Sequence, residues 1–543
     1  MNGILDVLIS WLFALLVWAP IGLWIVAKFD GGISDRPIHN FILGTIVGAA
    51  LNSALLAILS FWFPMHYYIN IGFIVINGIL FRNAFISGTK ELATSIWDWS
   101  WLNKIGFLAL AAIATICTLH LSLNNDSGLY YIQFIEWMNS YPVVPGLANL
   151  HDRFGFNSHW HLLSAAFNVH EQIGTGTNDL NALLFMLIGL GFFDSANRLI
   201  SKLDLFDLIW VLFPLPLFFL LRFLTSATPD LSSTLIPLVY FSYIVLKREK
   251  SSLPILVLIM AFAGTIKVFS ALHTLVLIPV LLLVLKSKNY KSLFLALLCG
   301  LLITLPWMGR NVVQTGYLVF PLESIDLVNS DWKVPPQLSE NARKMVATHA
   351  RTGSYELREY NAPTSEWFGI WLAARAKPML ALIGGAFVGS ILVLMIALVK
   401  LTRKKDFELA LISIFLSISV ILSFAFWWKT GPNPRFIYGT VFFFFAYTGA
   451  YLISNINLSK WLRFVPLLAL LPMGMITRTV LADKGPKLPT EFSSFKIEGA
   501  IISYPTRTDK CWRQELPCTT RERNNLELRG ESLIDGFRNS ARQ

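Results

Sequence analysis

A single carboxylate, Asp126, marks the point where an apolar run gives way to polar sequence. The run 105–123 is followed by two asparagines, which lead directly into Asp126. A carboxylate held at such a place can take the proton of an attacking hydroxyl group. Asp126 can instead be the N-cap of the amphipathic helix that apolar spacing predicts over 127–138, lying along a membrane interface. The two roles are compatible, because capping occupies one carboxylate oxygen and leaves the other free.

The loop that follows, 141–158, is rich in groups that bind polar ligands. Fixed donors and acceptors set among aromatic rings orient such a ligand, and the residues expected to do so are Tyr130, Asn149, His151, Arg153 and Asn157. A metal is the competing interpretation for three histidines of this region, His151, His159 and His161. The cysteine or acidic partners of a strong zinc motif are missing. We therefore predict hydrogen bonding or loop packing for these histidines and no metal ligands, although a divalent metal stays open as a cofactor.

Further charged residues stand beside or within apolar runs. Arg310 and Arg435 could bind an anionic leaving group such as phosphate, or reach out to lipid headgroups. Lys267 separates two apolar runs, where an ionisable side chain is either functional or the mark of a turn. Asp230 is a reserve acid, and the sequence favours its pairing with Arg222 across a short polar segment.

These residues are embedded in a chain whose composition is that of a membrane protein. Of its 543 residues, 55% are hydrophobic and only 14% are charged, whereas about a quarter are charged in a typical soluble protein. Apolar stretches of about twenty residues recur, and each can cross roughly 30 Å of hydrocarbon. We expect an all-α polytopic protein with 13 or 14 spans, near 4–27, 39–63, 67–84, 103–122, 179–199, 206–222, 230–246, 253–268, 270–286, 292–308, 377–399, 408–428, 435–454 and 462–480.

The net charge of +11 is explained by topology and not by nucleic-acid binding. Lysines and arginines concentrate in alternate loops, which the positive-inside rule assigns to the cytoplasm. The other, exoplasmic side then receives the loops 123–178 and 309–376, the second of which we expect to help bind an acceptor. It also receives the tail 481–543, a small appendage to the transmembrane module 1–480.

Two cysteines of the tail, Cys511 and Cys518, stand in a short polar segment. On an oxidising exoplasmic side they are expected to form a disulfide, with two free thiols as the alternative.

Four segments together resemble the GT-C superfamily of multi-span glycosyltransferases, which use polyprenyl-phosphate-linked sugars. They are Asp126-Ser127-Gly128-Leu129-Tyr130, the loop 141–158, Trp307-x-x-Arg310-Asn311 and Pro434-Arg435-Phe436. The likeness is greatest to a bacterial branch with a PVVPGL-N-LH-R-FNS loop, and it is strong over 120–165 and weak elsewhere. It implies a bacterial inner membrane, a site that faces the periplasm, and Asp126 as the catalytic base. Many members have two adjacent acids there, where this chain has Asn125-Asp126.

The leading hypothesis is therefore an inverting glycosyltransferase of the cell envelope. It would move a sugar from a polyprenyl phosphate to a glycan, lipid or protein, with membrane lipid around it and no nucleic acid as a partner. Displacing a lipid phosphate needs a base more than a strong acid, because the leaving group is already a stable anion. A polysaccharide polymerase or ligase is one alternative. A lipid-linked sugar flippase or transporter is the other, but the sequence shows no internal repeat and few mid-membrane charges.

Overall fold

The computed structural model describes residues 2–30, 35–120, 122, 124–168, 179–248, 251–403, 406–454, 488–523 and 525–540. This part of the chain contains nine helices long and apolar enough to cross a membrane. They are α1 (Asn2–Asp30), α2 (Pro37–Leu59), α5 (Trp101–Thr118), α10 (Leu180–Leu199), α12 (Pro229–Lys247), η5 with α14 (Val268–Lys286), α15 (Tyr290–Thr315), α18 (Lys377–Thr402) and α19 (Phe407–Thr430). The chain is a helical multi-pass membrane protein.

The expected 13 or 14 full spans exceed what the described residues contain. The expected spans 206–222, 253–268 and 435–454 are shorter helices: α11 (Leu205–Leu212) with η3 (Leu215–Phe223), α13 (Leu253–Ile266) and α20 (Tyr438–Ile453). The expected span 67–84 is α3 (Tyr67–Leu80), which bends by 87° into α4 (Arg82–Trp97) and gives a tenth span if the pair counts as one. The expected span 462–480 lies outside the described residues. Hydropathy identifies an apolar helix, but it does not show where the helix bends or whether it ends before it is long enough to cross a membrane.

Small residues bring the first two helices into close contact. A Cβ atom at Gly22 would lie 1.7 Å from the backbone oxygen of Gly44, and one at Gly48 would lie 1.8 Å from that of Trp18. Only hydrogen fits there, so α1 and α2 pack backbone to backbone, as helices in membranes do through small residues.

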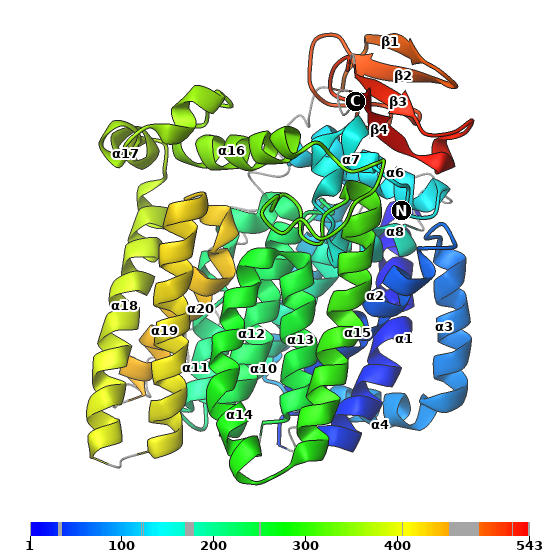
Figure 1. Cartoon of the computed structure of the whole chain (residues 1–543). Helices are drawn as coiled ribbons and strands as arrows, with labels where there is room; N and C mark the ends of the chain where they lie inside the picture. Colours follow the sequence, from blue (N-terminus) through cyan, green and yellow to red (C-terminus); the bar gives the residue numbers. More distant parts are fainter. Residues whose placement is uncertain are drawn as a thin grey trace.

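The part of the chain that connects α5 to α10 forms short segments, and these make a layer at one end of the bundle (Figure 1). They are the π-helix η1 (Ser127–Tyr131), α6 (Ile132–Ser140), α7 (Leu147–Leu150), the 3-10 turn η2 (Asp152–Gly155) and α8 (His159–Ala166). Residues Ser127–Tyr131 are all buried, as are five of the nine residues of α6. The apolar face of this expected helix is therefore covered by other parts of the protein and not free to contact lipid, and its position relative to a membrane stays a prediction.

Two further segments join this layer at the same end of the molecule (Figure 1). Between α15 and α18 the chain forms α16 (Pro336–Thr352), η6 (Leu357–Asn361) and α17 (Thr364–Ala373). The tail adds antiparallel pairs of strands, β1 (Phe492–Ile497) with β2 (Ala500–Pro505) and β3 (Leu526–Leu528) with β4 (Phe537–Asn539). The described part of the chain is thus mainly helical, as expected of an all-α polytopic protein, and its short strands are confined to the tail. The boundary expected near residue 480 falls outside the described residues and stays a prediction.

A disulfide joins Cys511 and Cys518 in the tail, and Trp512, the residue after Cys511, packs against the layer. The Trp512 backbone N–H donates to the Gly128 carbonyl oxygen at 3.0 Å, and its side chain is 5% exposed. A Cβ at Gly128 would meet the indole at 2.2 Å. Trp512 also has a φ of +48°, a left-handed conformation that costs a bulky residue about 1–3 kcal/mol and that only firm packing maintains.

Candidate functional site

A cavity of about 310 Å³ lies between the layer of short segments and the ends of the membrane helices. Its volume is at the lower end of the range for small-ligand sites, roughly 300–1,000 Å³. Six charged side chains line it: Asp126, Arg153, Asp230, Lys267, Arg343 and Arg435. Its remaining wall is largely apolar and aromatic, with Phe269, Phe426 and Phe436 among its members. The cavity therefore joins a charged region to a hydrocarbon-like one.

Asp126 reaches the cavity because other residues take over the capping of η1. Its backbone N–H donates to Oδ1 of Asn124 at 3.3 Å, and Asn124 in turn donates to Ser226 at 3.1 Å. Ser127 bonds to the same Ser226 hydroxyl at 2.8 Å. The Asp126 carboxylate makes no capping bond, so the prediction that it caps a helix is wrong. The side chain is left for another partner.

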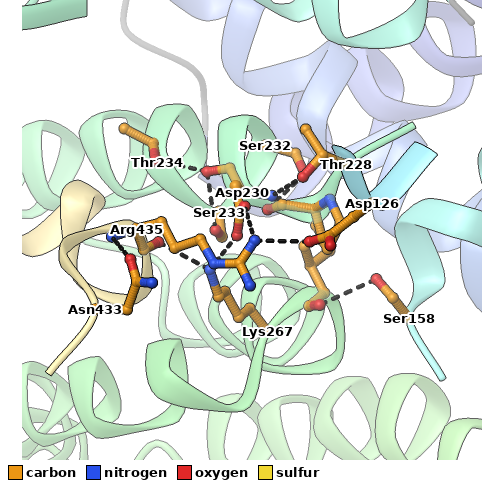
Figure 2. Close-up of polar contacts among 12 residues, drawn as sticks. Asp126, Ser158, Thr228, Asp230, Ser232, Ser233, Thr234, Lys267, Asn433 and Arg435 are labelled. Atoms are coloured by element: carbon orange, nitrogen blue, oxygen red, sulfur yellow. Dashed lines mark hydrogen bonds and ion pairs between the residues drawn. The ribbon is translucent and has the colours of Figure 1, made fainter. Parts of the chain in front are cut away.

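That partner is Arg435, which belongs to the short turn η7 (Pro434–Phe436). Its Nη1 donates to Oδ2 of Asp126 at 2.6 Å and lies 3.8 Å from Oδ2 of Asp230. Lys267 donates to Oδ1 of Asp230 and, at 2.8 Å, to the backbone oxygen of Arg435. Figure 2 shows the four side chains as one chain of ion pairs, with Arg435 between the two carboxylates. The predicted pairing of Arg222 with Asp230 is wrong, because Lys267 occupies that carboxylate.

Local sequence signals set the positions of these charges. Thr228 caps α12 by accepting from the Asp230 backbone N–H at 3.2 Å, and Pro229 fills the first helical position. Asp230 therefore lies in the first turn, where the helix dipole favours a negative charge. Asn433 caps η7 in the same way, accepting from the Arg435 N–H at 3.3 Å. Lys267 follows the last residue of α13 in an extended conformation, so its side chain leaves the helix axis.

The electrostatics favour an ionised Asp126. Burial alone would raise its pKa, but Arg435, Arg153 and His349 hold that pKa below its ordinary value. The pKa of Arg435 is raised well above its ordinary value, because the two carboxylates outweigh its burial. Asp126 is thus a carboxylate at neutral pH.

Cations exceed carboxylates among the described residues that line the cavity. Arg343 is compensated by Glu323, which lies outside the lining, at 2.8 Å. Within the lining, Arg153, Lys267 and Arg435 then face the carboxylates of Asp126 and Asp230. Asp152, outside the lining, also attracts Arg153, but it lies 3.5 Å from Arg523. The Arg153 guanidinium lies 5.8 Å from the Tyr130 ring centre, and among the described residues it hydrogen-bonds to no carboxylate. The surplus charge suits an anionic ligand.

The structure brings together seven of the residues singled out from sequence and separates three others. Asp126, Tyr130, Arg153, Asn157, Asp230, Lys267 and Arg435 line the cavity, and Asn149, His151 and Arg310 do not. Asn149 donates to the backbone oxygens of Trp332 and Phe537 at 2.8 and 3.3 Å. Arg310 is buried and donates to Ser60 and Asn157 at 2.5 and 3.3 Å. These side chains hold loops together.

His151 is likewise a structural residue. Its Nδ1 accepts from the Arg153 backbone N–H at 3.1 Å, and burial lowers its pKa to about 3. The imidazole is neutral at physiological pH, and it fixes the turn that carries Arg153.

The lining also contains His161 and Arg343, which belong to groups that the sequence pointed to without choosing among their members. His161 is buried in α8, and neither ring nitrogen has a partner among the described residues. Burial lowers its pKa to about 3, so it is a neutral donor or acceptor. His159 and His161 are two positions apart, and the sequence pointed to both. The fold shows that His161 lines the cavity and His159 does not. Arg343 comes from α16, in the loop 309–376 that was expected to help bind an acceptor. Within the described ranges, no group of three or more His, Cys, Asp or Glu side chains could hold a metal ion.

Comparisons with known proteins give one match. A family model described as "Domain of unknown function (DUF8201)" matches residues 4–442, a range that includes every residue lining the cavity. No curated protein and no solved structure matches the chain.

Proposed function

The chain belongs to the family described as a domain of unknown function (DUF8201), and we propose that it is a membrane glycosyltransferase. It transfers a sugar from a polyprenyl-phosphate-linked donor to a hydroxyl of a glycan, lipid or protein acceptor. The main support is the single cavity in which one ionised carboxylate, Asp126, stands among surplus cations beside an apolar wall. Base, anion-binding groups and a lipid-compatible surface are the three parts that this reaction needs.

The proposed step is a displacement at the anomeric carbon with inversion. The acceptor hydroxyl gives its proton to the free oxygen of Asp126, and its oxygen forms the new bond to the anomeric carbon. The bond from that carbon to the phosphate oxygen breaks, and its electron pair leaves with the lipid phosphate. A positioned base contributes about 10²–10⁴-fold to such a step. Arg435, Lys267 and Arg153 stabilise the charge that develops on the leaving phosphate.

The apolar wall fits the lipid part of the donor. The Phe269 ring lies 5.2 Å from that of Phe436 and 5.1 Å from that of Phe426. Val268 also lines the cavity and is 43% exposed. An isoprenoid chain can thus lie against these residues and continue into the bilayer. In this proposal the membrane is the bacterial inner membrane and the cavity faces the periplasm.

The test is release of lipid phosphate by the purified protein from a panel of polyprenyl-phosphate sugars, with an acceptor mixture present. Asp126→Asn should abolish release and leave membrane insertion and abundance unchanged. Asp98→Asn makes the same chemical change at an exposed position away from the cavity and should keep full activity. Unchanged transfer by Asp126→Asn would refute the assignment of the base.

Product analysis separates the competing activities. A single added sugar indicates the proposed transferase, and a ladder of repeats indicates a polymerase. Movement of labelled donor across vesicle membranes without phosphate release would indicate a transporter and contradict the proposal.

A further inference from the structure

The proposed base and its neighbouring cation neutralise each other when no ligand is present. Oδ2 of Asp126 and Nη1 of Arg435 are 2.6 Å apart, and both side chains line the cavity. A carboxylate held by a guanidinium at this distance is stabilised in its ionised form, so it has less tendency to take a proton. The ligand-free arrangement is therefore unfavourable for the step in which Asp126 must act as a base.

Arg435 is arranged so that its side chain can change partners while its backbone stays fixed. Lys267 and Asn433 hold the turn through the Arg435 carbonyl oxygen and N–H. The side chain is 24% exposed in the structure, and its Nε is buried with no hydrogen-bond partner in the part of the chain that the structure describes. The guanidinium thus retains unused donors beside a cavity that can hold a ligand. A phosphate accepts two parallel bonds from one guanidinium, which Asp126 does not do here.

The second carboxylate does not compete for Arg435 on equal terms. Oδ2 of Asp230 is 3.8 Å from Nη1 of Arg435, beyond hydrogen-bond distance, while Oδ1 of Asp230 is taken by Lys267. Oδ2 of Asp230 is buried without a hydrogen-bond partner among the described residues, so an arginine that leaves Asp126 can bond to Asp230 through one nitrogen and to an incoming anion through the others.

The charged and titratable groups around Asp126 come from every neighbouring element. They are Arg435 of η7, Arg153 of η2, His349 of α16, Tyr130 and Tyr131 of η1, Asp230 of α12 and Lys267 after α13. Within this described set, only Arg435 bonds directly to the Asp126 carboxylate. Its departure removes the closest positive charge, and the anion that replaces it adds negative charge nearby.

We infer that the donor phosphate draws Arg435 away from Asp126, so that the base becomes competent only once the donor is bound. This inference rests on the proposed function and adds an order to it: donor first, acceptor proton second. Arg435 then has two functions, because it binds the phosphate and controls the base.

The pH dependence of transfer tests this order. The acidic limb of kcat/KM reports free enzyme, in which Arg435 holds Asp126, and the acidic limb of kcat reports the donor complex. Losing the cation raises the pKa of a carboxylate. We therefore expect the acidic limb of kcat to lie at higher pH than that of kcat/KM for the donor. Arg435→Gln should narrow the gap between the two limbs, because only the charge of the bound phosphate then separates them. Arg435→Lys should restore part of the wild-type gap, and the exposed Arg403→Gln should behave as wild type.

A binding measurement serves as a second test that needs no turnover. Polyprenyl phosphate titrated calorimetrically in buffers of different ionisation enthalpy should bind with net proton uptake at mildly acidic pH. Asp126→Asn should bind with less uptake.

Coincident limbs in an active wild-type enzyme, or proton uptake equal in Asp126→Asn, would overturn the inference and leave the transferase proposal standing. Failure to release lipid phosphate from any donor would instead refute the proposed function.

Discussion

Substituting Gly128 and Trp512, singly and together, tests whether the tail holds the segment that carries Asp126. The gap between Gly128 and the indole of Trp512 has no room for a methyl group, because an added Cβ would lie 2.2 Å from Cε2. Carbon atoms need roughly 3.5–4.0 Å, so Gly128→Ala must push the two segments apart by more than about 1 Å. Such overpacking typically costs about 1–3 kcal/mol.

Trp512→Ala should cost about 3–5 kcal/mol in the local stability of the tail, since it empties a buried indole site. In that background the alanine at 128 no longer meets the ring. The double variant should therefore be more stable than the sum of the two single losses predicts, by about 0.5–3 kcal/mol, the range for residues in contact.

The assay is the thermal midpoint of the detergent-solubilised protein, combined with the rate at which protease cleaves the tail. Lipid phosphate release follows in parallel, because residue 128 is two positions from Asp126. Ile501→Ala, at an exposed position of β2, is the control and should leave all three readouts unchanged. Additive losses in the double variant would show that Trp512 and Gly128 do not pack as described.

Three further changes probe other contacts. Lys267→Met leaves the buried carboxylate of Asp230 without its main cation, so the thermal midpoint should fall by the equivalent of about 3–5 kcal/mol. Adding Asp230→Asn to Lys267→Met should recover part of the lost thermal stability. No recovery would contradict the pairing of Lys267 with Asp230. Burial lowers the pKa of His161 to about 3, below its unfolded value of about 6.5, so its stabilising effect is present above pH 6.5 and lost towards pH 3. In His161→Phe the thermal midpoint should therefore fall less steeply between pH 7 and pH 5 than it does in the wild type. Equal slopes in the two proteins would contradict a neutral, buried His161. Replacing Cys511 and Cys518 by serine should destabilise the tail by about 2–4 kcal/mol, seen as faster proteolysis with the membrane helices intact.

The sequence was a good guide to the charges that meet in the cavity. Lys267 interrupts apolar sequence, and Asp230 and Arg435 lie in short polar segments beside apolar runs, where the cost of burying a charge makes a chance occurrence rare. A buried charge also needs a partner to be stable, so these residues and Asp126 were expected to be paired or functional. Which carboxylate meets which cation could not be predicted, because Asp126 and Arg435 are 309 positions apart.

The sequence was a poorer guide to polar residues of loops. Asn149 and Arg310 have the same donors as a binding residue, but they satisfy the backbone of Trp332 and the side chain of Ser60. The sequence next to a residue gives no information about partners this far away along the chain. The same limitation applies to the helix after Asp126, whose apolar face looked like a membrane-surface face until the packing of Trp512 was known.

The contacts of the tail also affect the order in which the protein can mature. Gln133 of α6 donates to the backbone oxygens of Trp512 and Gln514 at 3.1 and 2.6 Å, and Pro145 accepts from the Phe537 N–H at 2.9 Å. A ribosome makes residues 512–537 only after every helix up to α20 has been synthesised. A newly inserted bundle therefore has the segment around Asp126 uncovered until residues 512–537 have been translated and can pack against it.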